Sequence, residues 1–528
     1  MNAARLLEHF DLISDAADAV PRLRRLVLDL AIRGKLVEQR EGQPLSHSQH
    51  GSPLPFLIPS QWHATTVGES LQMINGRAFK PADWLPQGLP IVRIQNLNNG
   101  AASFNYCKPD AVDLKHVIDD GTFLISWSGT PGTSFGAFIW RRGKAALNQH
   151  IFKCLPRTAL FDDRFLQISI NGRLDEMIAK AHGGVGLQHI TKGKLEALAI
   201  PLPPLAEQQR IVAKVNELMA LCDRLEAAQV EREARRDRLV AASLARVSQP
   251  AADDAGSDAR AAGFHLDHFA RLTTRPEHVK QLRQTILNLA VRGRLVPQDP
   301  KDPPLSPLLD RMAAAKAAHL TRSGSVKNVS TPTPLSSSKA PWLIPASWGW
   351  FSFGDVVISR DAERIPVSKE QRSGLAKTYD YYGASGVIDK IDRYLFDKPL
   401  LLIGEDGANL INRSTPIAFI ARGEYWVNNH AHVLDGESED LLRFLELHIN
   451  AIDLKPFVTG TAQPKMNQAK MNSIPIALPP LAEQRRIVAK VDELMALCDQ
   501  LEASLAAAAT DRARLLESLL HEALAPAA

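Results

Sequence analysis

The chain has 528 residues, of which 45% are apolar, and a formal net charge of +4. This length is too great for one hydrophobic core, so we expect a globular protein of three or four packed units. Four cysteines are too few for a disulfide framework, and their spacing does not match a metal site, which excludes the small secreted classes. The weakly basic charge permits nucleic-acid binding but does not indicate it.

Targeting and membrane signals are lacking in the sequence. The N-terminal residues have neither the basic start nor the apolar core of a secretory signal, and no run of about 18 apolar residues predicts a membrane span. We therefore expect a cytoplasmic protein with no membrane partner.

The first predicted element is a short helix that ends at Gly34. Leu23, Leu26 and Leu30 share one helical face, and Gly34 stands where a left-handed C-terminal cap belongs. The same pattern, LAxRGxLV, returns in the second half of the chain, where Gly293 takes the capping position. Each copy predicts a short helix with a sharp end.

A polar connector and a variable segment follow each short helix. The connectors, Glu41–Pro55 and Pro297–Pro341, are rich in proline and serine, and the longer one is expected to be flexible. Each ends at a Leu-Ile-Pro sequence followed by a tryptophan, and an insert then runs over residues 56–200 or 342–476. The inserts alternate short β-branched or aromatic runs with glycine turns, which is typical of mixed domains with short strands.

A nearly exact repeat follows each insert. Pro203–Ala228 and Pro479–Ser504 differ at four positions only, so the chain contains an internal duplication. Two prolines and an early Glu207 predict an abrupt helix start, and a helix from Leu205 to about Val247 would be on the order of 65 Å long. Apolar residues at steps of three and four predict a coiled-coil seam formed by Ile211, Val215, Leu218, Cys222, Leu225, Ile487, Val491, Leu494, Cys498 and Leu501.

These elements predict an α+β protein with a pseudo-two-fold internal repeat. The expected parts are an N-terminal helical segment (1–45), a first insert domain (46–203), a central helical spacer (204–296), a flexible connector (297–341), a second insert domain (342–478) and a C-terminal long helix (479–528). The helical parts are closely similar between the two copies, whereas the inserts share little beyond their first and last segments.

This arrangement resembles the specificity (S) subunit of type I restriction-modification systems. The resemblance covers essentially the whole chain, through the PPLxEQxxIVxKVxxL helix starts, the LAxRGxLV helix ends, and the sequences YYGASGVID (381–389), LLIGEDGANL (401–410) and WVNNHAHVL (426–434). It implies that the inserts are target recognition domains and that the long helices form an antiparallel coiled coil. It also implies docking of two methyltransferase (M) subunits, which restriction (R) subunits join.

The resemblance further implies a non-catalytic subunit that binds double-stranded DNA. S-adenosylmethionine, ATP and Mg²⁺ are then expected on partner subunits and not on this chain. Because the inserts differ, the target is expected to be an asymmetric, bipartite sequence. Two alternatives remain open, namely a self-contained DNA methyltransferase or nuclease and a coiled-coil scaffold that binds only protein.

Catalytic and metal motifs are incomplete in this sequence. Lys301–Leu305 reads KDPPL, in which leucine replaces the aromatic residue of an amino-methyltransferase motif, and Gly193-Lys194 lacks the other residues of a phosphate-binding loop. Asn428–His432 offers two imidazoles without a third ligand, and Glu405–Gly407 is first a turn signal. We therefore expect no catalytic residue and no metal ligand.

Loop residues of both inserts suit DNA recognition, which needs paired hydrogen bonds to bases and cations near phosphates. In the first insert the candidates are Arg77, Lys80, Arg93, Gln95, Asn96, Asn98, Arg141, Arg142, Lys144, Asn148, Gln149 and His150. In the second they are Tyr381, Tyr382, Ser385, Asn409, Asn412, Arg413, Asn428, Asn429 and His430. A segment before each long helix adds Gln188, His189, Gln463, Lys465 and Asn467, although a tight structural turn explains that segment equally well.

Overall fold

The computed structural model describes residues 8–16, 18–39, 53–129, 135–173, 178, 182–184, 187–248, 267–322, 329–336, 338, 340–460 and 463–525. It divides into two compact units. Unit 1 comprises Met1–Arg232 with Ala508–Ala528, and unit 2 comprises Glu233–Ala507. Among the helices in the described ranges, none is long and apolar enough to cross a membrane.

Two long helices, α9 (Leu205–Ser248) and α19 (Leu481–Leu524), begin directly after a proline pair, as predicted. Buried glutamines explain the repeated PPLAEQ start. Gln208 donates from Nε2 to the carbonyl of Pro203 at 2.8 Å, and Gln484 donates to the carbonyl of Pro479 at the same distance. Each glutamine thus ties the first helical turn to the strand before it.

In unit 1 the short helices α2 (Phe10–Ile13) and α3 (Ala19–Ile32) pack on the last part of α19. Ile13 contributes to a buried cluster with Leu516 and Leu519, and Lys35 donates to the carbonyl of Leu524 at 2.9 Å. The C-terminal helix therefore completes the unit that the N-terminal segment begins.

Unit 2 has the same construction. Its short helices α11 (Phe269–Leu272) and α12 (Pro276–Val291) pack on the last part of α9 through a buried cluster that contains Val240 and Leu272. Asp237 of α9 accepts hydrogen bonds from Arg275 and from His278 Nε2, the latter at 2.9 Å. In both units the end of one long helix covers a pair of short helices.

The first insert domain is closed at its base by strands β1 (His63–Thr66) and β13 (Ala199–Leu202), which pair antiparallel. One sheet has the order β2-β10-β6-β8, with bounds Leu71–Asn75, Ile151–Pro156, Phe123–Ser126 and Gly136–Ile139. A second has the order β4-β3-β9-β5, with bounds Asn105–Cys107, Leu89–Val92, Ala145–Leu147 and Val117–Ile118. A small third sheet joins β11 (His182–Gly184), β12 (Leu187–His189) and β7 (Ser128–Gly129), and the helices are α4 (Val67–Ser70), α5 (Ile94–Asn98), α6 (Asp163–Asn171) and α8 (Lys192–Glu196).

The second insert domain is closed by β14 (Gly349–Ser352) and β22 (Pro475–Leu478). Its main sheet has the order β15-β21-β18-β19, with bounds Ile358–Ser359, Ala431–Asp435, Leu400–Gly404 and Ala418–Ala421. Its second sheet joins β17 (Gly386–Ile391), β16 (Tyr379–Gly383) and β20 (Tyr425–Val427). The helices are α14 (Phe353–Val356), α15 (Lys369–Ser373), α16 (Asn409–Asn412), α17 (Glu439–Ala451) and α18 (Gln468–Asn472).

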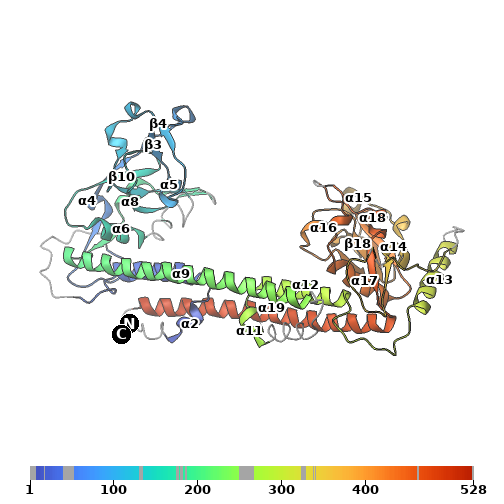
Figure 1. Cartoon of the computed structure of the whole chain (residues 1–528). Helices are drawn as coiled ribbons and strands as arrows, with labels where there is room; N and C mark the ends of the chain where they lie inside the picture. Colours follow the sequence, from blue (N-terminus) through green and yellow to red (C-terminus); the bar gives the residue numbers. More distant parts are fainter. Residues whose placement is uncertain are drawn as a thin grey trace. The chain divides into compact units, whose positions relative to one another are not determined.

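The two insert domains share one framework despite their unlike sequences. In each main sheet the third strand, β6 or β18, pairs antiparallel with both neighbours. In each second sheet a parallel pair, β3 with β9 or β16 with β20, lies beside an antiparallel partner. Figure 1 shows α6 between α9 and the strands of the first domain, and α17 packs in the same way on α12 and β19. The predicted fold class, two mixed domains on repeated helices, is confirmed.

A glycine joint anchors each insert domain to its short helix. Gly34 has a φ of +65°, and a Cβ added there would meet Cγ of Pro59 at 2.5 Å. Trp62, three residues on, places its ring 6.4 Å from that of Phe165 in an edge-to-face contact. Thus the predicted helix cap also lets the Pro-x-x-Trp segment close against the helix end.

Unit 2 repeats this joint. Gly293 has a φ of +68°, a Cβ there would meet Cγ of Pro345 at 2.4 Å, and the rings of Trp348 and Phe444 lie 6.0 Å apart. The repeated glycine therefore meets two requirements, the left-handed backbone and the close approach of proline.

The prediction that residues 297–341 form a flexible connector is wrong in part. Residues Ser306–Arg322 form helix α13, whose Leu308, Leu309 and Met312 are buried in the main core of the second insert domain. Upstream, Asp302 accepts two hydrogen bonds from Arg486, at 2.9 and 2.6 Å. The spacing of these apolar residues is typical of a helix. The surrounding proline and serine residues, however, predict a flexible connector.

The predicted coiled-coil seam has partners within each unit. Ile211 and Val215 share a buried cluster with Val27, Trp62 and Phe165, and Leu218 packs against it. Ile487, Val491 and Cys498 share one with Ile286, Trp348 and Phe444, against which Leu494 and Leu501 pack. Cys222 is also buried, and Leu225 is half-buried. Over these turns the seam packs on the short helix and insert domain of its own unit.

A left-handed backbone costs a residue with a Cβ about 1–2 kcal/mol. We predict that Gly34→Ala and Gly293→Ala each destabilise the protein by more than this amount. The excess comes from the contact with Pro59 or Pro345. Thermal unfolding checks this, with Gly121→Ala as a matched control, because Gly121 has a φ of +85° but no atom near an added Cβ. Equal losses in all three variants would contradict the joint.

Candidate nucleic-acid interface

Three segments meet at one end of the main sheet in each insert domain, and we call this place the loop junction. In the second domain it comprises residues 405–407, 428–430 and 463–466. The Glu405 amide donates to the carbonyl of His430 at 2.8 Å, and the Met466 amide donates to the carbonyl of Glu405 at 2.8 Å. One residue after β18 therefore holds the other two loops through its backbone.

The first domain builds the same junction from residues 127–129, 148–150 and 187–190. The Trp127 amide donates to the carbonyl of His150 at 3.3 Å, and the Ile190 amide donates to the carbonyl of Trp127 at 3.0 Å. Trp127 thus takes the place of Glu405. The two junctions share a backbone arrangement and differ in their side chains.

Charged side chains surround the junction of the second domain. Arg364 donates to Glu405 at 3.0 Å, and Lys465 lies 3.2 Å from the same carboxylate. Burial alone would raise the pKa of Glu405, but the bond from Arg364 and the charges of His432 and Lys465 outweigh it and lower the pKa. Asp406 lies 2.7 Å from Nδ1 of the exposed His430. These contacts tie the loops to one another.

Buried His432 secures this junction from below. Its Nδ1 lies 2.6 Å from Asp361, and its Nε2 lies 2.9 Å from the carbonyl of Met466. Burial lowers the pKa of His432, but the bond to Asp361 and the further contacts outweigh it, so the pKa is raised above its ordinary value. The imidazole therefore joins β21 to the 463–466 loop.

Aromatic contacts replace these charges in the first domain. The rings of Trp127 and His150 lie 5.5 Å apart, and Gln149 Nε2 lies 3.2 Å from His150 Nε2. Gln149 is exposed. An exposed amide beside an imidazole and an indole that lie tilted against each other can form hydrogen bonds and ring contacts with a ligand, whereas the second junction offers mainly charges.

Several predicted contact residues have structural roles instead. Asn96 is buried and donates to the carbonyl of Ser103 at 3.0 Å, and Tyr381 is buried with its hydroxyl donating to Val367 at 3.1 Å. Asn428 is buried and accepts the His430 amide at 2.8 Å. Arg413 donates to the carbonyl of Ile452 at 2.6 Å. The polar atoms of these residues are thus bonded inside the domain, and base contact by them stays a prediction.

Others are bonded at the surface. Arg93 donates to Asn105 at 3.1 Å, Arg142 donates to the carbonyl of Asn96 at 2.9 Å, and Arg77 bonds the carbonyl of Ala111. In the same way Gln95 bonds Ser103, Asn409 bonds Thr415, and Asn467 caps α18. Tyr382 packs on Phe419 with ring centroids 5.8 Å apart, and Asn148 is half-buried.

A third group is exposed. Within the described part of the chain, no side-chain hydrogen bond ties Lys80, Arg141, Lys144, Ser385, Asn412, Asn429 or Gln463, and each of these residues is exposed. Asn98 is exposed as well. Gln188 and His189 lie in β12, which pairs with β11 and β7, but their side chains lie outside the described residues.

A repeat inside the inserts escaped the sequence prediction. Residues 164–171 read RFLQISIN in α6, and residues 443–450 read RFLELHIN in α17. Asn171 and Asn450 each accept a hydrogen bond from a strand amide, that of Ala137 at 2.8 Å and that of Ala418 at 3.2 Å. A search for short repeats that are not separated by the same number of residues as the repeated helices would have found this motif.

Motifs that suggested chemistry are used structurally. Asp302 of the KDPPL sequence is bonded to Arg486, and the two imidazoles of residues 430 and 432 bond different carboxylates. Among the residues that the structure describes, no group of three or more His, Cys, Asp or Glu side chains could hold a metal ion.

A family model described as "Type I restriction modification DNA specificity domain" matches residues 59–234 and 345–510, which are the two insert domains with the starts of α9 and α19. The chain belongs to this DNA specificity family. The duplicated framework is thus the family domain in two copies, and the resemblance inferred from the sequence is confirmed.

Related specificity subunits match along most of this chain. The "Type I restriction enzyme EcoEI specificity subunit" of Escherichia coli is 26% identical over 564 residues, covering 96% of this chain and 94% of the relative. The EcoAI specificity subunit of Escherichia coli is 25% identical over 563 residues, with the same coverage. Both relatives are named as specificity subunits, and members of this family supply specificity and not catalysis.

One solved structure supports the fold of this specificity chain. It is described by the words "Structural basis underlying complex assembly and conformational transition of the type I R-M system". It is 15% identical in sequence, covers 89% of this chain and 99% of its own, and has a TM-score of 0.51.

We predict that Asp361→Asn destabilises the protein more at pH 6 than at pH 9. A raised pKa means that folding favours protonated His432, so this stabilisation is full below about pH 6.5, the unfolded value, and is lost as pH rises through the folded value. Denaturant unfolding at both pH values measures the difference. A loss that does not change with pH would contradict the pairing of His432 with Asp361.

Proposed function

We propose that this chain reads an asymmetric, bipartite DNA sequence for a type I restriction-modification complex. The observation that carries the proposal is one family framework built twice, with unlike side chains at its two loop junctions. Two similar frames suit two contacts of the same kind, and unlike junctions suit two different half-sites.

We further propose that the chain positions catalysis without performing it. Two methyltransferase (M) subunits would bind the repeated helical frame, one per unit, and restriction (R) subunits would join them. The duplication supports this, since the frame offers each copy of a partner a similar surface. S-adenosylmethionine, ATP and Mg²⁺ would be bound by those partners. We place the complex in the cytoplasm, where its DNA is.

Mapping of methylated adenines in DNA from cells that express this chain with its neighbouring M subunit tests the proposal. We expect one motif with two defined parts and an unread spacer, absent from cells that express the M subunit alone. Methylation or cleavage by the purified chain alone would favour a self-contained enzyme. Absence of any target preference in the M–S complex at moderate salt would favour a protein scaffold.

We predict that replacing residues 56–200 with the matching segment of a related specificity chain changes one half-site only. The ends of this insert are held together by the pairing of β1 with β13, so an exchange leaves the frame in place. Methylation mapping reads the result. Exchange of residues 342–476, bounded by β14 and β22, is the matched control and should change only the other half-site. A change of both half-sites by either exchange would contradict the assignment.

A further inference from the structure

The hairpin of β16 and β17 exposes two adjacent apolar side chains. Val387 and Ile388 are 50% and 55% exposed. Neighbouring residues of a regular strand point to opposite faces, but the strand register shifts here. Tyr382 pairs with Val387 and Tyr381 pairs with Asp389, which leaves Ile388 as an extra residue. Such a bulge turns the strand and redirects its side chains, so both residues face solvent.

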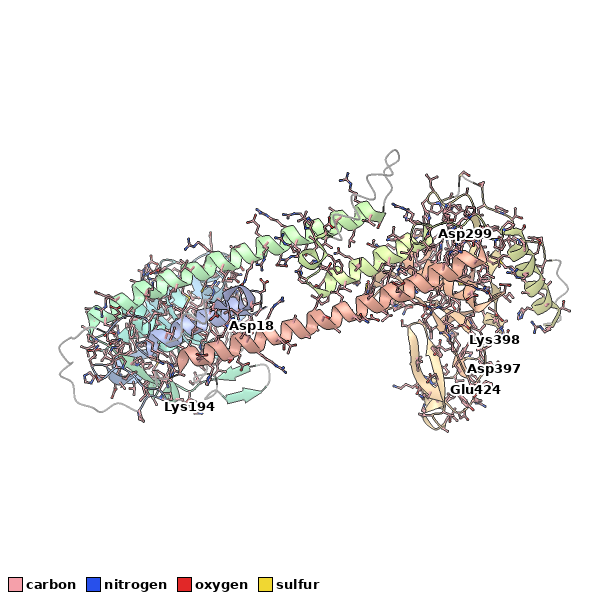
Figure 2. All side chains as sticks on the ribbon, turned by 90° about the horizontal axis from the view of Figure 1, so that it is seen from below. Asp18, Lys194, Asp299, Asp397, Lys398 and Glu424 are labelled. Carbon is pink, nitrogen blue, oxygen red and sulfur yellow. The ribbon has the colours of Figure 1, made fainter. Side chains whose placement is uncertain are left out.

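This hairpin lies against the loop junction of the second insert domain. A Cβ added at Gly404, the last residue of β18, would meet the carbonyl oxygen of Ala384 in the hairpin turn at 2.6 Å. The Asn428 amide, from a junction loop, donates to the carbonyl of Tyr382 at 3.0 Å. Figure 2 shows the hairpin standing out from the body of unit 2, near the labelled Asp397 and Glu424.

The first insert domain has polar residues in the connection that corresponds to the hairpin turn. In its second sheet β3 takes the place of β16, because each is the strand that pairs in parallel with its neighbour and antiparallel with its hairpin partner. Between β3 and β4 the chain forms α5 and exposes Gln95 and Asn98. Between β16 and β17 it forms only the turn at Ala384 and Ser385. The connection between these strands therefore exposes amides in the first domain, whereas in the second it is a short turn that leads into the bulge with Val387 and Ile388.

Apolar side chains can distinguish few features of a base pair. In the major groove three of the four bases present only hydrogen-bonding groups at their edges, and thymine alone adds a methyl group, at C5. Valine and isoleucine cannot pair with the hydrogen-bonding groups, but they can pack on this methyl. Their exposure beside a polar junction suits base contact better than it suits a protein interface, because Ser385 in the hairpin turn and Asn429 and Gln463 in the junction loops are exposed and polar.

We propose that Val387 and Ile388 contact thymine C5 methyl groups in the major groove and so determine part of the half-site read by the second insert domain. This inference rests on the proposed function, since it requires that the domain reads DNA. It assigns the apolar part of the recognition to the bulge and leaves hydrogen bonding to the junction loops.

Replacement of thymine by uracil in the DNA isolates this contact, because uracil lacks only the C5 methyl. The M–S complex is titrated with duplexes of the mapped target in which each thymine of the half-site, on either strand, is changed to uracil in turn. We expect uracil to weaken binding by the wild-type complex about fourfold at one or two positions, the effect of losing one buried methyl-sized group. Ile388→Ala or Val387→Ala should bind the thymine and uracil duplexes equally at those positions.

Leu343→Ala is the control variant, because Leu343 is 92% exposed and lies outside the hairpin. It should keep the full preference for thymine. The inference is overturned if uracil has no effect at any position, if its effect persists in the hairpin variants, or if the half-site contains no thymine. It is also overturned if the hairpin variants lose M-subunit binding instead of thymine preference. Loss of all target preference by the wild-type complex would instead overturn the proposed function.

Discussion

Both units depend on a glycine, a residue without a side chain, at the end of a short helix. At Gly34 and Gly293 the backbone is left-handed, and the space that a Cβ would fill is taken by a proline of the following segment. The tryptophan three residues after that proline then meets a phenylalanine of the insert domain edge to face. One contact chain thus runs from short helix to insert, and its glycine, proline, tryptophan and phenylalanine are present in both copies. The rest of each insert is therefore free to differ.

The loop junctions show how this freedom is used. Trp127 and Glu405 hold their neighbouring loops through the same two backbone hydrogen bonds, which do not depend on the identity of the side chain. The side chains then produce an aromatic surface in one domain and a charged one in the other. Because folding is supported by the backbone, recognition chemistry can change at these positions without loss of the framework.

Much of the frame could be predicted from the sequence, because it depends on local rules. Two prolines fixed the starts of α9 and α19, and a glycine in a fixed context fixed the ends of the short helices. Helix α13 could not be predicted in this way, because its three apolar residues lie in a proline-rich connector and the helix is stabilised by the core in which they are buried.

The candidate site was harder to predict. Tyr381 and Asn428 have side chains suited to base contact, but the direction of a side chain follows from strand register, which the residue type does not reveal. The roles of Arg364 and Asp361 could not be predicted either, because these residues lie far in sequence from the carboxylate and the histidine that they contact. Nor could the bulge at Ile388 be predicted, since a one-residue shift in pairing leaves no mark in a single sequence.

The division of the long helices has a thermodynamic consequence. Residues 205–232 of α9 belong to unit 1 and residues 233–248 to unit 2, and α19 is divided in the same manner. If one unit melts, both helices must terminate in their middle, where four backbone groups at each new helix end lose their helical partners. The two units have separate hydrophobic cores. The interrupted helices nevertheless destabilise the unit that stays folded. Two cores with independent packing are thereby made to unfold cooperatively.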